Sequence, residues 1–229
     1  MITSFSLIST LRKVLGLLML ALGVAGGAHA QGYDFSTFMS GGGGGIDPAK
    51  QKIARGMGAY ICLYVSDRST PSGSSVQFTI RSMIPEPKSR IGVIAFDTGR
   101  HTDLFSKLSV NLQSLGMKAG MGSPEVHPFL PRFTPEYWVG IPHTRIDLPG
   151  STGFKPGNLV VVTATLGRGK TFANVISALN EGMNPATAAS GLRVGVIVTY
   201  LLGGPPPGVG TINDDGGFVA TRISSLCRG

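Results

Sequence analysis

Short runs of hydrophobic residues, separated by Gly, Pro, Ser and Asp, recur along the chain from residue 59 onward. These runs are rich in Val, Ile, Thr, Tyr and Phe, a composition that is typical of β-strands. They predict strands over residues 59–65, 75–82, 90–96, 108–112, 137–141, 158–166, 192–202 and 218–226.

Two hydrophobic patterns distinguish these strands. Residues 75–81 and 218–223 alternate between apolar and polar side chains, so each of these strands is expected to have one face in water. Residues 159–162 and 194–198 form continuous apolar runs, which predict central strands buried on both faces.

Helical periodicity marks a second class of segments. Over residues 171–183, apolar side chains recur at the spacing of an amphipathic helix; they are Phe172, Val175, Ile176 and Leu179. Residues 49–55 predict a short helix, because Asp47 and Pro48 fit the N-cap and the first helical position. Residues 103–115 fit another helix, but 108–112 also fit a strand, and both alternatives stay open.

These elements can share one hydrophobic core in a chain of 229 residues. With 42% hydrophobic and 14% charged residues, the composition excludes a coiled coil and a charge-driven disordered chain. We therefore expect a mainly β fold, namely a single β-sandwich-like or β-rich α+β domain over residues 46–229 with one or two short helices.

Residues 1–30 have the three parts of a cleaved signal peptide. Arg12 and Lys13 precede an apolar run over 14–24, and small residues end the segment at Ala28 and Ala30. The apolar run is shorter than the roughly 20 residues of a membrane-spanning helix, so no retained transmembrane helix is expected. Cleavage before Gln31 and export to the periplasm or the cell surface are predicted.

Residues 31–45 end in a run of glycines, a composition that favours a flexible N-terminal arm. Three aromatic residues interrupt this arm: Tyr33, Phe35 and Phe38. They predict either a segment that docks onto a partner protein or loose packing onto the body of the same chain.

The chain contains two cysteines, Cys62 and Cys227. In the oxidising compartment that the signal implies, they are expected to form one disulfide, with two buried free thiols as the alternative. The histidines after the signal, His101, His127 and His143, lack the paired spacing of a metal site. Neither a metal nor another cofactor is expected.

The formal net charge is +8, and removal of the signal takes away two of the positive charges, Arg12 and Lys13. The remaining excess favours an anionic surface such as a lipid headgroup or a glycan as a partner. No arginine-rich run or interleaved aromatic platform is present, so nucleic acid is not expected as a partner.

Residues 164–171 approach the pattern of a phosphate-binding P-loop between a predicted strand and a predicted helix. Ala164 replaces the first glycine of that pattern, which weakens the case for a nucleotide site. Two other interpretations stay open: an anion-binding turn and a basic turn that only caps the helix. The anion-binding turn would use Arg168, Gly169, Lys170 and Thr171.

Asp97 opens the triplet Asp-Thr-Gly at the end of a predicted strand. Aspartic proteases use this triplet, but their chemistry needs two carboxylates, so a homodimer would have to supply the second. A turn in which Asp97 accepts hydrogen bonds explains the same residues. A nucleophilic triad can be drawn from His101 or His143, Asp103 or Asp147, and one of the many serines, although no Gly-x-Ser-x-Gly motif is present.

Trp138, the single tryptophan, follows Tyr137 and fits a sugar platform, a protein-binding hot spot or a core residue. Taken together, these features favour an exported, non-enzymatic binding or structural protein. We expect a subunit of a cell-envelope, secretion or conjugation, or surface-appendage assembly, with other envelope or appendage proteins as partners. The alternative is a periplasmic hydrolase that uses Asp97 in a dimer or a histidine-centred site.

Overall fold

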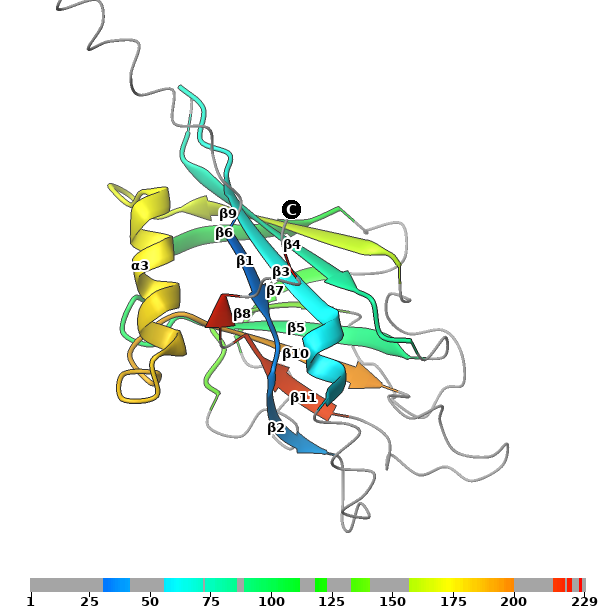
Figure 1. Cartoon of the computed structure of the whole chain (residues 1–229). Coiled ribbons are helices and arrows are strands. Elements are labelled where there is room, and N and C mark those ends of the chain that lie inside the picture. Colours follow the sequence, from blue (N-terminus) through cyan, green and yellow to red (C-terminus); the bar gives the residue numbers. More distant parts are fainter. Residues whose placement is uncertain are drawn as a thin grey trace, which may run out of the picture.

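Two six-stranded antiparallel sheets form the body of the protein in the computed structural model (Figure 1). The structure describes residues 31–41, 56–71, 73–85, 89–111, 118–122, 133–140, 157–199, 216–220, 222–223 and 227. The expectation of a mainly β fold is confirmed. Residues 1–30, the predicted helix at 49–55, His127, His143 and Asp147 lie outside the described residues.

The first sheet, sheet A, contains in spatial order β12 (Arg222–Ile223), β1 (Gln31–Asp34), β3 (Ile61–Asp67), β4 (Ser75–Ser82), β9 (Leu159–Leu166) and β6 (Phe105–Val110). The second, sheet B, contains β2 (Thr37–Gly41), β11 (Gly216–Val219), β10 (Arg193–Thr199), β5 (Arg90–Asp97), β8 (Tyr137–Gly140) and β7 (Lys118–Met121). A short 3-10 helix, η1 (Gly58–Tyr60), precedes β3, and one α-helix, α3 (Phe172–Met183), connects β9 to β10.

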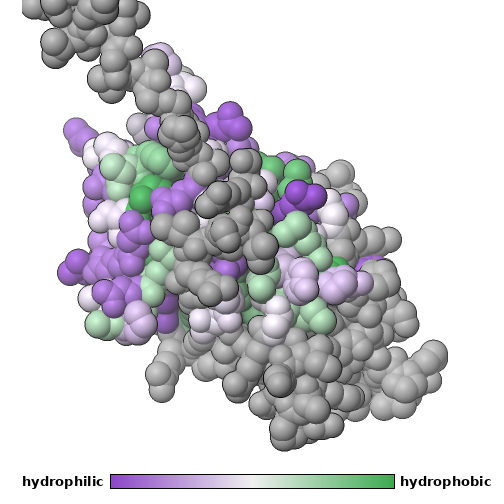
Figure 2. Space-filling model, viewed as in Figure 1, coloured by the Kyte–Doolittle hydropathy of each residue, from purple (hydrophilic) through white to green (hydrophobic). Residues whose placement is uncertain are grey.

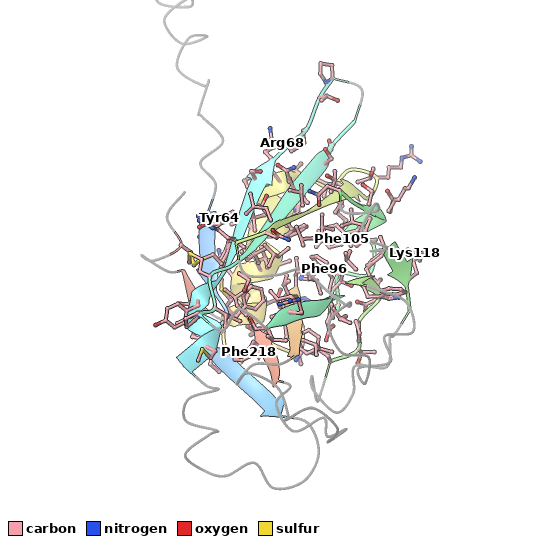
Figure 3. The ribbon with its side chains drawn as sticks, turned by 90° about the vertical axis from the view of Figure 1, so that its right-hand side faces the viewer. Tyr64, Arg68, Phe96, Phe105, Lys118 and Phe218 are labelled. Carbon is pink, nitrogen blue, oxygen red and sulfur yellow. A yellow bond between two sulfur atoms is a disulfide. The ribbon has the colours of Figure 1, made fainter. Side chains whose placement is uncertain are left out.

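The hydrophobic core lies between the two sheets, where Phe96 and Phe105 come from opposite sheets (Figure 3). Phe78 makes edge-to-face contacts with both rings, at centroid distances of 5.1 Å to Phe96 and 5.8 Å to Phe105. Each fully buried aromatic side chain of this kind stabilises the fold by about 2–3 kcal/mol. The core therefore joins the two sheets into one unit.

The two sheets are also joined at one side by a bent pair of strands. β1 and β12 pair in sheet A, and their direct continuations β2 and β11 pair in sheet B. Tyr33 and Phe35, on the first of these bent segments, are fully buried. The expectation of a flexible arm is therefore wrong for residues 31–41, because Tyr33 and Phe35 fill the core and the backbone of β1 and β2 is paired.

The Cys62–Cys227 disulfide predicted from the sequence is present and joins residues separated by 165 positions. Cys227 passes over β1 to reach Cys62 on β3. At Gly32 in β1, an added Cβ atom would lie 1.7 Å from the carbonyl oxygen of Cys227. Only glycine fits at this crossing.

Helix α3 confirms the prediction over 171–183 and lies at one end of the two sheets (Figure 1). Thr171 is its N-cap and forms a reciprocal capping box with Asn174. Val175, Ala178 and Leu179 are buried in the core. The amphipathic pattern therefore identified both the helix and its buried face.

Three predictions about individual strands need correction. The helix over 103–115 is wrong within the described residues, because Phe105–Val110 pairs with β9 as β6. β9 is buried on one face and not on both, since its burial alternates. Val219 in β11 is buried next to buried Phe218, so the alternation expected over 218–223 does not produce one wet face there.

Other strand predictions hold. β4 alternates as expected, and Val194–Val198 in β10 are buried throughout. The second face of β10 is covered by a small apolar cluster of Ala95, Phe133, Ile197 and Val219. Within the described residues, no helix has the length and hydrophobicity needed to cross a membrane.

Candidate functional site

The segment between β5 and β6, residues 98–104, passes from sheet B to sheet A beside the C-terminal end of α3. The amide of Arg100 donates to the carbonyl of Ser190 at 3.0 Å. Gly99 has φ +58°, and an added Cβ atom there would lie 2.5 Å from the Ser190 oxygen. This close approach requires glycine and fixes the segment against the turn that follows α3.

Five charged or titratable side chains gather where this segment meets α3. We call them the charged cluster: Arg100, His101, Asp103, Lys170 and Glu181. Figure 2 shows hydrophilic residues gathered on the side of the molecule where α3 lies.

Glu181 is the centre of the charged cluster. Its carboxylate contacts the Arg100 guanidinium at 2.9 Å and His101 Nε2 at 2.8 Å. The hydrogen bond from His101, followed by the positive charge of Arg100, lowers the pKa of the Glu181 carboxyl. Glu181 therefore ties α3 to the segment between the sheets.

Asp103 and Lys170 form the second part of the charged cluster, with 2.8 Å between the carboxylate and the ammonium group. The hydrogen bond from Lys170 lowers the pKa of the Asp103 carboxyl. His101 and Asp103 thus have different partners, so the structure does not bring them together as two members of a triad.

Asp97, the aspartate of the Asp-Thr-Gly triplet, is 2% exposed at the end of β5. One carboxylate oxygen accepts the amide of Gly99 at 3.0 Å, and the other accepts the amide of Thr134 at 3.0 Å. The second oxygen also forms an ion pair with Arg193. Asp97 therefore holds its own turn, the chain at Thr134 and the start of β10.

Arg193 completes this buried arrangement from β10. Its guanidinium lies 4.5 Å from the centre of the Phe133 ring, a cation–π distance. An aspartic-protease carboxylate must instead be open to substrate and share a proton with a second acid. The geometry at Asp97 matches the alternative interpretation, a turn aspartate that accepts hydrogen bonds.

Glu136 and Arg193 are the residues of this region that the sequence interpretation did not identify. Glu136 accepts the amide of Thr98 at 2.7 Å, and the buried Thr98 hydroxyl has no hydrogen-bond partner among the described residues. A lone arginine at the start of an apolar strand was a usable signal for Arg193, because a buried cation needs a carboxylate. No comparable signal marks Glu136.

The P-loop-like segment forms a strand, a tight turn and a helix, but its groups are already occupied. Lys170 binds Asp103, and Asn174 Oδ1 accepts the amide of Thr171 at 2.8 Å. Thr171 Oγ1 in turn accepts the amide of Asn174 at 3.4 Å. These are groups that a bound phosphate would use, so the geometry favours the basic turn that caps a helix.

The two other members of this segment differ from Lys170. Gly169 has φ +75°, a left-handed conformation that favours glycine and forms the turn. Arg168 is exposed and forms no ion pair with a residue of the described ranges.

The aromatic residues proposed for partner binding have different positions. Tyr33 and Phe35 lie in the core, and burial raises the pKa of Tyr33 to about 12. Phe38 lies in β2, opposite Phe218, and its side chain is outside the described part of the structure. Neither Tyr33 nor Phe35 is accessible to a partner in this fold.

Trp138 is half-buried in β8 and lies over β7. At Gly120 an added Cβ atom would lie 2.5 Å from Trp138 Cε2, so the indole ring occupies the space that a side chain would need. Trp138 is therefore outside the core between the sheets and keeps part of its surface open.

No group of three or more His, Cys, Asp or Glu within the described ranges is arranged to hold a metal ion. A comparison of the chain with protein-family models, curated proteins and solved structures finds no significant match. The function of the site is therefore inferred from its own chemistry.

Proposed function

We propose that this chain is an exported, non-enzymatic binding or structural protein that works in a cell-envelope, secretion or conjugation, or surface-appendage assembly. The observation that carries the proposal is the Cys62–Cys227 disulfide, the pairing of the two cysteines of the chain. Disulfides persist in oxidising compartments such as the periplasm and the cell surface.

The N-terminal sequence supports the same destination. The predicted signal ends at Ala30, and β1 begins at Gln31. Cleavage at that point leaves Gln31–Asp34 in the mature protein, where these residues pair with β3 and β12.

A binding or structural role is supported by the way the titratable groups are used. Asp97, Asp103 and Glu181 each form an ion pair within the chain. A catalytic acid or base needs instead to reach the reacting atoms of a substrate.

The alternative, a periplasmic hydrolase, draws on one observation, the 2.8 Å contact between His101 Nε2 and Glu181. A carboxylate that orients a histidine is one part of a nucleophilic triad. Arg100 binds the same carboxylate and competes for its charge, which favours a structural role for the pair.

The test is expression of the full chain with a C-terminal tag in a Gram-negative host. We expect the protein in the periplasmic fraction, with a mature N-terminus at Gln31 and no thiol that reacts with maleimide before reduction. Intact protein in the cytoplasm with two reactive thiols would contradict the proposal. Crosslinking and mass spectrometry of the native envelope would then identify partner proteins, whereas hydrolysis that is lost in His101→Asn would favour the alternative.

A further inference from the structure

The outer face of sheet A carries an ordered array of polar side chains. Strands β6, β9, β4 and β3 pair in register, so residues directly opposite each other lie in rows on the same side of the sheet. The first row is Lys107, Thr165, Ser75 and Arg68; the second is Ser109, Thr163, Gln77 and Ser66; the third is Asn111, Val161, Thr79 and Tyr64. We call these twelve positions the polar face.

The polar face points away from the core. Its positions alternate along the strands with residues buried between the sheets, such as Val76, Phe78 and Val162. None of the twelve side chains is buried, and those at the β6 edge are exposed. Tyr64 lies in β3, and Arg68 directly follows the end of this strand at the base of a hairpin that projects from the body (Figure 3).

The charge of the polar face is positive without compensation. It contains two cations, eight neutral hydroxyl or amide side chains and no carboxylate. Lys107 and Arg68 make no ion pair with a residue of the described ranges. Asp67, next to Arg68 in sequence, accepts the amide of Ser69 at 2.8 Å, and its hydrogen bonds with Ser69 lower its pKa.

The two cations stand at opposite ends of the first row, with the hydroxyls of Thr165 and Ser75 between them. Three strand spacings separate their backbones, which is about 14 Å. The Nε of Arg68 donates to Gln77 Oε1 at 2.9 Å, so its guanidinium lies along the face toward the second row. This spacing fits two anionic groups on one extended molecule better than a single small ion.

We propose that the polar face binds an extended acidic polysaccharide that carries sulfate or uronate groups. Lys107 and Arg68 bind the anionic groups through charge-assisted hydrogen bonds. Within the neutral rows, Ser75, Ser109, Asn111 and Gln77 each make one side-chain hydrogen bond inside the protein. The hydroxyls of Thr165, Thr163, Thr79 and Ser66 make none with a described residue, and these hydroxyls donate to and accept from sugar hydroxyls. The Tyr64 ring provides an apolar surface at one corner. This inference rests on the proposed export, because it places the protein where such polysaccharides occur.

The composition of the polar face favours a polysaccharide over nucleic acid. Nucleic-acid binding draws most of its affinity from many phosphate contacts and from bases stacked on aromatic rings. The polar face has four neutral hydrogen-bonding side chains for every cation and one aromatic ring, Tyr64. A molecule rich in hydroxyl groups forms hydrogen bonds with more of these side chains than a nucleic acid does.

The experiment measures binding of the purified mature chain, with its disulfide intact, to heparin, polygalacturonate, dextran and single-stranded DNA by calorimetry. We expect binding to heparin or polygalacturonate and none to dextran. The double variant Arg68→Ser/Lys107→Ser is expected to bind the acidic polysaccharide roughly tenfold more weakly or worse. Lys118→Ser, which removes an exposed cation from β7 in sheet B, is the matched control and should change the affinity less than twofold.

A second variant separates recognition of sugar from attraction of charge. Thr163→Val keeps the shape of the central row and removes its hydroxyl, and Thr163 lies beside both Gln77 and Ser109. We expect about a threefold loss of affinity for the polysaccharide and no change for DNA. Three results would each overturn the inference. Lys118→Ser could lose as much affinity as the double variant, or the wild-type protein could bind DNA more tightly than the polysaccharide. The double variant could also keep full affinity for the polysaccharide at an unchanged melting temperature. Exported, disulfide-bonded protein that binds neither acidic polysaccharide would overturn this inference alone and leave the proposed function standing.

Discussion

The α3 end of the molecule and the outer face of sheet A use charge in opposite ways. The α3 end consists of the segment 98–104, helix α3 with the preceding Lys170, and the start of β10 at Arg193. At the α3 end, each of Arg100, Lys170 and Arg193 has a carboxylate partner. On the outer face of sheet A, Lys107 and Arg68 have no carboxylate partner among the described residues. Paired charges therefore hold parts of this chain together, whereas the two cations of the polar face point into solvent without a carboxylate among the described residues.

The difference follows from what each region needs. The segment 98–104 crosses between the sheets, so its backbone lacks the regular hydrogen bonds of a strand and is held instead by side chains such as Asp97 and Glu136. Sheet A is held by its own ladder of backbone hydrogen bonds. The exposed cations of its outer face therefore need no carboxylate partner to hold the sheet together.

We expect removal of the buried Asp97 carboxylate to lower the free energy of unfolding more than the other substitutions do. Asp97→Ala removes the carboxylate that pairs with the buried Arg193 guanidinium, and we expect a loss of about 3–5 kcal/mol in the free energy of unfolding. Urea denaturation followed by circular dichroism measures it. Lys107→Ser is the control from the other region and should change stability by less than about 0.5 kcal/mol.

One result would contradict this contrast between the two regions. A loss in Asp97→Ala no larger than that of Lys107→Ser would show that the buried pair does not hold the α3 end. Asp97→Asn, which keeps an oxygen for the Gly99 amide and loses the charge, should fall between the wild type and Asp97→Ala.

The second effect concerns the covalent bond that holds sheet A on its β1 side. Cys62→Ala/Cys227→Ala is expected to lower the free energy of unfolding by about 2–5 kcal/mol, because the unfolded chain loses a long closed loop. The loss should be the same in low and high salt, unlike that of an ion pair. An unchanged denaturation midpoint would show that the disulfide carries no stability.

The smallest effect concerns the surface part of the α3 end. The pKa of Glu181 is lowered in the folded protein, so its carboxylate stabilises the fold above the ordinary glutamate pKa, and this stability is lost as the pH falls through the lowered value. Glu181→Gln should remove that contribution and flatten the decline in stability below about pH 4.5. Melting temperatures of both proteins between pH 3 and 7 measure it.

The pKa values of Asp103 and Asp67 are also lowered, so these carboxylates add to the pH dependence of stability in acid. The difference between wild type and Glu181→Gln is therefore the quantity to compare. If the melting temperatures of the two proteins differ by the same amount at every pH, the contact of Glu181 with His101 and Arg100 contributes nothing to folding. The effect should be small because the Arg100 side chain is 68% exposed, and water weakens an exposed ion pair.

Features that depend on a local residue pattern, or on the number of residues of one type, could be predicted from the amino-acid sequence alone. Alternation and β-branched composition identified β4, β5 and β9, and a periodic apolar stripe identified α3 and its buried face. Two cysteines in a chain with a predicted export signal left one intramolecular pairing, Cys62 with Cys227. Each of these conclusions needs only neighbouring residues or a count.

Features that depend on residues far apart in the sequence could be established only from the tertiary structure. Residues 31–41 have a glycine-rich end that favours flexibility, yet β3, β12 and β11 pair with them and the core buries Tyr33 and Phe35. Phe105–Val110 has spacings compatible with a helix, and pairing with β9 makes it a strand. The physical reason is that backbone pairing and burial outweigh weak local preferences.

The site depended on tertiary structure most of all. Asp97 and Arg193 are 96 residues apart in sequence, and His101 and Glu181 are 80 apart. A charged side chain has no local periodicity that identifies its partner, because an ion pair requires only that two side chains meet in space. The fold brings these partners together, and it separates the charges that stabilise the protein from the charges that face outward.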